Sequence, residues 1–154
     1  MPGDLTTTVE LQHDMLFRAT TGTGHELTMD ARPAVGGNNA AARPMEMLLV
    51  GLGGCTGMDV ISILRKMRQT VTSYQVHVAG DQAREHPRVF TRIDVEHVVR
   101  GRGLNVEMVK HAIELSATRY CSAEAMLGAV ARIQEHYRVI DETTGTETAG
   151  TLEK

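Results

Sequence analysis

Residues 44–69 read PMEMLLVGLGGCTGMDVISILRKMRQ, the longest run of apolar residues in the chain. Apolar residues cover nearly all sides over the first four turns, which predicts a helix from Met45 to about Gln69 that is buried all round. Pro44 is well placed as the first helical residue. Four glycines interrupt the helix: Gly51, Gly53, Gly54 and Gly57. Because each costs roughly 1 kcal/mol of helix propensity relative to Ala, they indicate close approach of another helix or of a substrate to the backbone.

Three short β-prone runs precede this helix: TTTVELQ (6–12), MLFRATT (15–21) and HELTMDA (25–31). His13-Asp14 separates the first two runs, and the turn at 22–24 separates the second from the third. This pattern predicts a meander of three antiparallel strands, followed by a loop that ends at Pro44.

The sequence after the helix alternates between strand and helix patterns. VTSYQVHVAG (71–80) and RVFTRIDVEHVVRG (88–101) have period-two alternation and predict a hairpin through a turn around His86-Pro87. Helices are expected over about 105–119 and 123–134, with HYRVID (136–141) as a closing strand. The tail after Asp141 lacks apolar residues, so we expect it to be frayed. The class is α+β, in a single domain of residues 1–154 with its core at about 5–141.

Composition excludes several functional classes. The net charge of −3 gives no basic surface for nucleic acid or an anionic membrane. The opening residues do not resemble a signal peptide. The longest apolar run, around 45–64, is interrupted by glycines, Asp59 and Ser62, so we expect no membrane span. Two cysteines do not make a disulfide-dense secreted scaffold, which favours the cytoplasm.

The two cysteines are the candidate reactive residues. Cys55 lies in the glycine-rich part of the long helix, either as a small core residue or as a nucleophile in a pocket that admits a substrate. Cys121 precedes a predicted helix with Ser122 as a plausible N-cap, so it is either a buried cysteine or a thiol stabilised by exposed backbone N–H groups. These alternatives stay open at the level of single residues.

No pattern of metal ligands accompanies the cysteines. The seven histidines are scattered, and neither HExxH nor CxxC nor a zinc-type Cys/His spacing occurs. Asp59 lies one turn from Cys55 on the same helix face, although such a residue more often reflects helix polarity than catalysis. We therefore expect no metal and no cofactor.

Three segments together carry a resemblance to a known family: RPMEMLLVGLGGCTGMDV (43–60), VFTRIDVEHVVRG (89–101) and RYCSAEAML (119–127). They resemble the OsmC/Ohr family of organic hydroperoxide reductases, with a matching order of elements over about 5–141. The resemblance implies an OsmC-like fold, with antiparallel sheets packed around two central cysteine-bearing helices in an intertwined homodimer. It also implies active sites at the subunit interface.

The resemblance further implies roles for individual residues. Cys55 corresponds to the peroxidatic cysteine and Cys121 to the resolving cysteine, which an external dithiol returns to the reduced state. Family reductases carry Glu where this chain has Met45, and Glu46 lies about 100° further around the helix. Arg18 is the nearest candidate for the activating arginine. The chain looks closer to an uncharacterised branch of OsmC-like proteins.

Two functions from different classes follow. The first is thiol-dependent reduction of organic hydroperoxides in oxidative stress defence, by Cys55 and Cys121. The second is a non-enzymatic OsmC-like dimer that binds a small apolar ligand at the subunit interface. A thiol at its reference pKa of about 8.5 is mostly protonated at neutral pH, so the first function needs a group that activates Cys55. A cysteine hydrolase is a distant third, because no particular histidine can be paired with either thiol.

Overall fold

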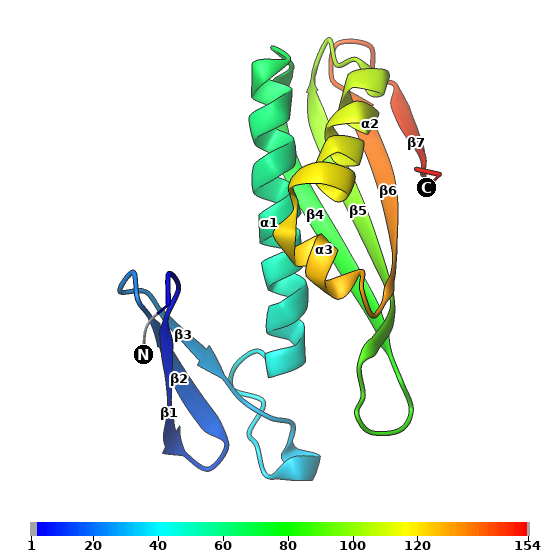
Figure 1. Ribbon diagram of the computed structural model, residues 1–154. Coiled ribbons are helices and arrows are strands. Elements are labelled where there is room, and N and C mark those ends of the chain that lie inside the picture. Colours follow the sequence, from blue (N-terminus) through cyan, green and yellow to red (C-terminus); the bar gives the residue numbers. More distant parts are fainter. Residues whose placement is uncertain (1–2, 154) are drawn as a thin grey trace. The chain divides into compact units, whose positions relative to one another are not determined.

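The computed structural model describes residues 3–153, which form two compact units (Figure 1). The N-terminal unit runs to Leu48, and the C-terminal unit begins at Leu49. The boundary falls within the long cysteine-bearing helix. The expectation of one domain over the whole chain stays a prediction.

The N-terminal unit contains a three-stranded sheet in the order β1-β2-β3. Its strands are β1 (Thr7–His13), β2 (Leu16–Thr21) and β3 (Glu26–Met29). Both pairs are antiparallel, which confirms the predicted meander. The second turn requires Gly24, whose φ of 87° is unfavourable for other residues.

Asp30 organises the loop after β3. Its buried carboxylate accepts backbone N–H groups from Ala31 at 2.7 Å, Asn38 at 3.1 Å and Ala40 at 2.9 Å. The Ala40 hydrogen bond, together with those from Ala31 and Asn38, lowers the pKa of Asp30 despite the opposing effect of burial. The loop also contains a short 3₁₀ turn, η1 (Pro33–Val35), and reaches the long helix at Pro44.

The C-terminal unit contains a mixed sheet in the order β4-β5-β6-β7. Its strands are β4 (Thr70–Gln82), β5 (Phe90–Arg102), β6 (Arg132–Asp141) and β7 (Glu147–Thr151). The predicted hairpin is confirmed as β4-β5, and β6 pairs with β7 antiparallel. The α+β class is confirmed, and the antiparallel sheets that the resemblance implied include one parallel pair, β5 with β6. The two helices between these strands return the chain to the starting end of the sheet, as a parallel pair requires.

Two boundaries near the C-terminus differ from the sequence expectation. The helix expected over 123–134 is the short α3 (Ser122–Leu127), and β6 already begins at Arg132. Alternate residues of β6 are buried against the core, including Ile133 and Val139, so period two prevails there. The expected frayed tail instead forms β7, since β6 offers its backbone groups for pairing and apolar content is not needed.

Helix α1 (Pro44–Lys66) begins as its sequence predicts. The Glu46 carboxylate accepts the Arg43 backbone N–H at 2.8 Å, so Glu46 caps the first turn. The prediction that α1 is buried on all sides is wrong for the single chain. A stripe at every fourth residue is buried: Leu52, Thr56, Val60 and Leu64.

The opposite side of α1 remains open. Val50 and Met58 are 61% and 74% exposed, because one sheet covers only one side of a helix. By length and composition alone, α1 is also apolar enough to cross a membrane. An apolar core helix of a soluble protein meets the same criterion.

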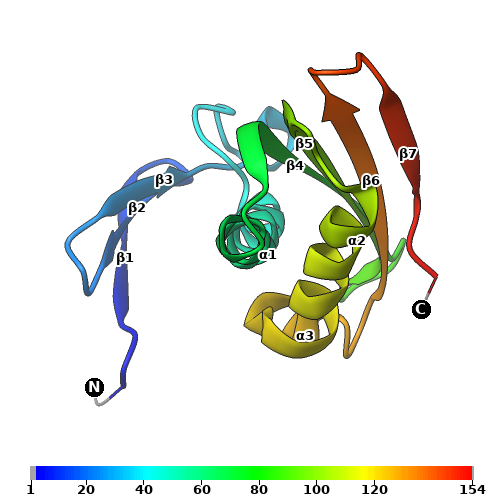
Figure 2. The same cartoon turned by 90° about the horizontal axis from the view of Figure 1, so that it is seen from above.

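The core of the C-terminal unit lies between its sheet and its helices. Helix α2 (Val106–Leu115) and the later part of α1 lie on the same face of the sheet (Figure 2). The buried cluster draws on both helices, β5, β6 and the segment before α2: Val60, Leu64, Val99, Leu104, Val109, Ala112, Ile113 and Val139. Asn105 caps α2 by accepting the Met108 N–H at 3.2 Å. A π-helical turn, η2 (Ser116–Tyr120), follows, so the helical segment predicted at about 105–119 is confirmed.

Candidate functional site

Cys55 lies in α1 beside glycines of two kinds. A Cβ added at Gly53 would lie 3.2 Å from Val78 of β4, and one at Gly57 would lie 3.4 Å from Val76. These two glycines therefore allow α1 to approach the sheet closely. Within the part of the chain that the structure describes, a Cβ at Gly54 would have no neighbour within 4 Å. Cys55 itself is half-buried and carries a free thiol.

Cys121 occupies the N-cap position of α3 and is only 3% exposed. Its Sγ accepts the backbone N–H of Glu124 at 3.4 Å. The pKa of the Cys121 thiol is raised to about 12, and burial is the largest cause of this increase. The Glu124 N–H lowers this pKa, as the sequence led us to expect, whereas Cys55 and the Glu124 carboxylate raise it. Cys121 is therefore held as a thiol at neutral pH.

The fold brings the two cysteines together with Asp59. Sγ of Cys55, Sγ of Cys121 and a carboxylate oxygen of Asp59 all lie within 4.8 Å of one another. In the sequence, the one-turn spacing from Cys55 is the single signal for Asp59. The tertiary structure makes it the third member of the site.

Ser116 positions the Asp59 carboxylate. Its hydroxyl donates to Oδ2 of Asp59 at 3.1 Å and lies 2.9 Å from the hydroxyl of Thr56. A hydroxyl has one proton, so Thr56 is the donor to Ser116. Both hydroxyl side chains are buried, and Ser116 begins η2. π-Helical turns are frequent at functional sites, but no sequence signal singled out Ser116.

A small cavity borders Cys121 on the side of η2. Its volume is about 160 Å³, and its lining includes Ala117, Tyr120, Ser122 and Ala125 besides Cys121. The cavity lies beside Cys121, which is otherwise buried.

A buried polar chain lies elsewhere in the same unit. The Tyr74 hydroxyl lies 2.6 Å from Nδ1 of His97, and Nε2 of His97 lies 2.9 Å from the Glu135 carboxylate. His97 and Glu135 are both fully buried. Burial and the charges of Glu135 and Asp59 raise the pKa of Tyr74 above its usual range. No local pattern predicts this buried chain, because His97 is one of seven histidines scattered along the sequence.

The other two sequence candidates, Arg18 and Glu46, belong to the N-terminal unit. Arg18 makes long ion pairs with Glu10 at 3.7 Å and Glu26 at 4.0 Å on neighbouring strands. Glu46 caps α1 through the Arg43 N–H. Each therefore has a local structural role, and their part in the chemistry stays a prediction.

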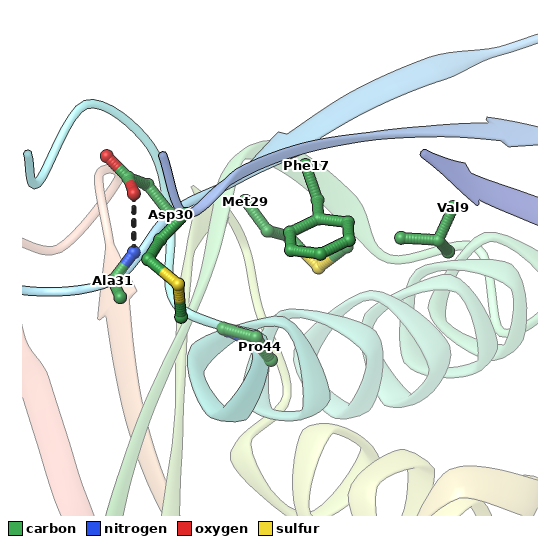
Figure 3. Close-up of a pocket in the computed structure, with 7 residues that line it drawn as sticks. Val9, Phe17, Met29, Asp30, Ala31 and Pro44 are labelled. Atoms are coloured by element: carbon green, nitrogen blue, oxygen red, sulfur yellow. Dashed lines mark hydrogen bonds between the residues drawn. The ribbon is translucent and has the colours of Figure 1, made fainter. Parts of the chain in front are cut away.

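The N-terminal unit also contains an apolar cavity of about 290 Å³ (Figure 3). Side chains of Val9, Met15, Phe17 and Met29 line it, with Pro44 at the start of α1. The Asp30 carboxylate is engaged by the loop backbone, so the cavity presents almost only apolar groups.

Comparison with known proteins places the chain in a family. The family described as OsmC-like protein matches residues 36–136. Protein YhfA of Escherichia coli (strain K12) is 37% identical over 126 residues, covering 82% of this chain and 91% of YhfA.

Solved structures agree with this relationship. A hypothetical protein from Aquifex aeolicus VF5 has a TM-score of 0.80 at 28% identity, covering 92% of this chain and 99% of that one. An organic hydroperoxide resistance protein OsmC from Legionella pneumophila has a TM-score of 0.65 at 12% identity, with 89% and 96% covered, which shows a shared fold alone. On its matched residues, its identity to YhfA and its fold, this chain belongs to the OsmC-like protein family.

Proposed function

We propose that this protein is a thiol-dependent peroxidase that reduces organic hydroperoxides in the cytoplasm as part of oxidative stress defence. The observation that carries the proposal is the pair of free sulfur atoms within 4.8 Å of each other. Two thiols at this separation need little movement to reach the S–S bond length of about 2.05 Å.

The two cysteines differ in a way that fits different roles. Cys55 is half-buried and the more accessible, so it attacks the peroxide. Cys121 is covered, and its raised pKa keeps it protonated until a sulfenic acid forms beside it. This division agrees with the roles that the family resemblance implies.

The reaction proceeds in three steps. The Cys55 thiolate attacks the O–O bond, which gives a sulfenic acid and releases the alkoxide as an alcohol after protonation. The Cys121 thiol then condenses with the sulfenic acid, forming the Cys55–Cys121 disulfide and water. An external dithiol reduces this disulfide and is itself oxidised, through a mixed disulfide.

Asp59 serves proton transfer in this scheme. A carboxylate oxygen of Asp59 lies within 4.8 Å of both sulfur atoms, and Ser116 fixes its orientation. We assign to Asp59 the removal of the Cys55 thiol proton, which leaves the attacking thiolate, and the delivery of that proton to the departing alkoxide.

The protein acts as a homodimer in this proposal. The exposed apolar side of α1, with Val50 and Met58, is the kind of surface that a second copy of the chain would cover.

A second candidate function is binding of a small apolar ligand without catalysis. The apolar cavity of about 290 Å³ in the N-terminal unit favours it, because its volume approaches that of small-ligand pockets. In this case the two cysteines are merely packed against each other.

Peroxide consumption separates the two functions. The purified protein with a dithiol as reductant is expected to consume an organic hydroperoxide faster than hydrogen peroxide. Cys55→Ser abolishes turnover, since a hydroxyl cannot replace the thiolate nucleophile. A matched control is Ser73→Ala on an exposed position of β4, which should turn over like the wild type. Wild-type thiols that remain reduced in excess peroxide would exclude the peroxidase.

A further inference from the structure

The three side chains at the cysteine site also form a set of metal ligands. Cys55, Asp59 and Cys121 offer two sulfur atoms and one carboxylate oxygen, all within 4.8 Å of one another. Ligand atoms of a tetrahedral Zn²⁺ site, with bonds of about 2.0–2.3 Å, lie roughly 3.3–3.8 Å apart. Small side-chain rotations therefore bring all three within bonding distance of one ion.

The electrostatics of the site favour a cation. Cys121 is only 3% exposed, Cys55 and Asp59 are half-buried, and their three ligand atoms lie within 4.8 Å of one another. Two thiols and a carboxylate thus share a partly covered site with a further carboxylate beside it. A divalent ion compensates this charge and permits both thiols to ionise.

Hydrogen bonds from neighbouring groups hold the ligand side chains in place. Ser116 donates to Asp59 and is itself fixed by Thr56, while the Glu124 N–H points at Sγ of Cys121. Such outer partners orient metal ligands and are needed for full affinity. A cavity of about 160 Å³ borders Cys121, one of the three proposed ligands.

We propose that the reduced protein binds one Zn²⁺ per chain through Cys55, Asp59 and Cys121, and that formation of the disulfide expels it. Soft thiolates select zinc over magnesium and calcium. Binding releases the two thiol protons and leaves the metal at its +2 charge. The site itself does not depend on peroxidase activity.

The expulsion step by peroxide does rest on the proposed function. The two thiolates give two electrons to the hydroperoxide, whose O–O bond breaks as the S–S bond forms. With two protons from solvent, the products are the disulfide, an alcohol and water, and Zn²⁺ leaves because both sulfur donors are consumed.

Titration of the phosphine-reduced full-length protein tests the site. Zn²⁺ followed by calorimetry should bind once per chain, with a buffer dependence that reports two protons released. Co²⁺ in its place should give a sulfur-to-cobalt charge-transfer band in the near ultraviolet. Asp59→Asn should weaken binding, and Asp81→Asn, which alters an exposed carboxylate of β4, should not. Ser116→Ala should weaken it by about 10–100-fold through loss of carboxylate orientation.

Two results would contradict the proposed zinc site. One is a folded, reduced wild type without the charge-transfer band, and the other is metal binding that Cys55→Ser and Cys121→Ser both leave unchanged.

The expulsion step is tested with the oxidant diamide, a diazene that takes two electrons and two protons from the thiols and becomes a hydrazine. Zinc should appear in the filtrate as the disulfide forms, and zinc retained on the disulfide form contradicts the proposal. If zinc binds but a hydroperoxide leaves metal-free thiols reduced, the peroxidase function fails while the zinc site stands.

Discussion

The Sγ atoms of Cys55 and Cys121 lie within 4.8 Å of each other as free thiols, although one comes from α1 and the other from the turn before α3. One equivalent of an organic hydroperoxide should therefore convert them into a disulfide. Mass spectrometry should show a loss of about 2 mass units in the wild type and a gain of about 16 in Cys121→Ser, where Cys55 stops as sulfenic acid. A gain of about 16 in the wild type would show that Cys121 does not resolve the intermediate.

The different burial of the two cysteines predicts their order of alkylation. Near neutral pH, iodoacetamide should modify Cys55 before Cys121, because Cys121 is 3% exposed and its pKa is about 12. Peptide mapping after partial modification measures the order. Since the pKa of Cys121 is raised, its modification should accelerate only as the pH rises well above neutrality. Earlier modification of Cys121 would exchange the two proposed roles.

The two classes of glycine in α1 predict opposite responses to leucine. Gly53→Leu should lower the melting temperature, because even a Cβ would already press on Val78. Gly54→Leu meets open space within the described single chain, and removing a helical glycine alone would stabilise by up to about 1 kcal/mol. If a second copy covers this face, Gly54→Leu instead dissociates the dimer while the chain stays folded.

Light scattering and thermal unfolding, measured together, separate these effects. A dimeric wild type with a monomeric Gly54→Leu variant supports pairing through α1. A variant with unchanged oligomer size and a raised melting temperature places the dimer interface elsewhere.

Asp30 predicts a loss of stability in acid. The pKa of Asp30 is lower in the folded state than in the unfolded state, chiefly because of the Ala40 hydrogen bond. Its contribution to the free energy of unfolding is therefore complete above the unfolded-state pKa and disappears as the pH falls through the folded-state pKa. Asp30→Asn should remove this part of the acid dependence and destabilise the loop even at neutral pH, because an amide replaces an acceptor of three N–H groups. Asp4→Asn, at an exposed position, is the control. Equal acid profiles for wild type and Asp30→Asn would contradict the assignment.

The buried chain through His97 predicts a cost for removing the Tyr74 hydroxyl. Tyr74→Phe leaves Nδ1 of His97 without its partner in the core, which should cost about 1–3 kcal/mol in the free energy of unfolding. Tyr120→Phe is the matched control, because Tyr120 is 54% exposed. Denaturant unfolding measures both, and equal values for the two variants would show that water replaces the lost hydroxyl.

Local patterns in the sequence were sufficient for most elements and for the two reactive residues. The alternation in β4 and β5, the turns of the N-terminal meander and Pro44 at the start of α1 depend on neighbouring residues, so the sequence alone predicts them. Cys55 and Cys121 stood out because thiols are few and their surroundings unusual. Three quoted segments sufficed to identify the family, which the match over residues 36–136 confirms.

Pairing between distant segments was decided by tertiary structure alone. The tail became β7 because β6 offers an edge, and β6 began early because β5 pairs with it in parallel. Neither effect leaves a trace in local composition.

The site required the same long-range information. Asp59, Ser116 and Thr56 come from α1 and η2, and only the packing of those elements places a carboxylate beside two sulfur atoms. Similarly, the pKa of Cys121 is set mainly by burial, which overrides the effect of the helix N-terminus that the sequence did indicate. The sequence determined which groups are capable of chemistry, whereas the fold decided which of them meet and in what electrostatic surroundings, because both depend on contacts between residues far apart in the chain.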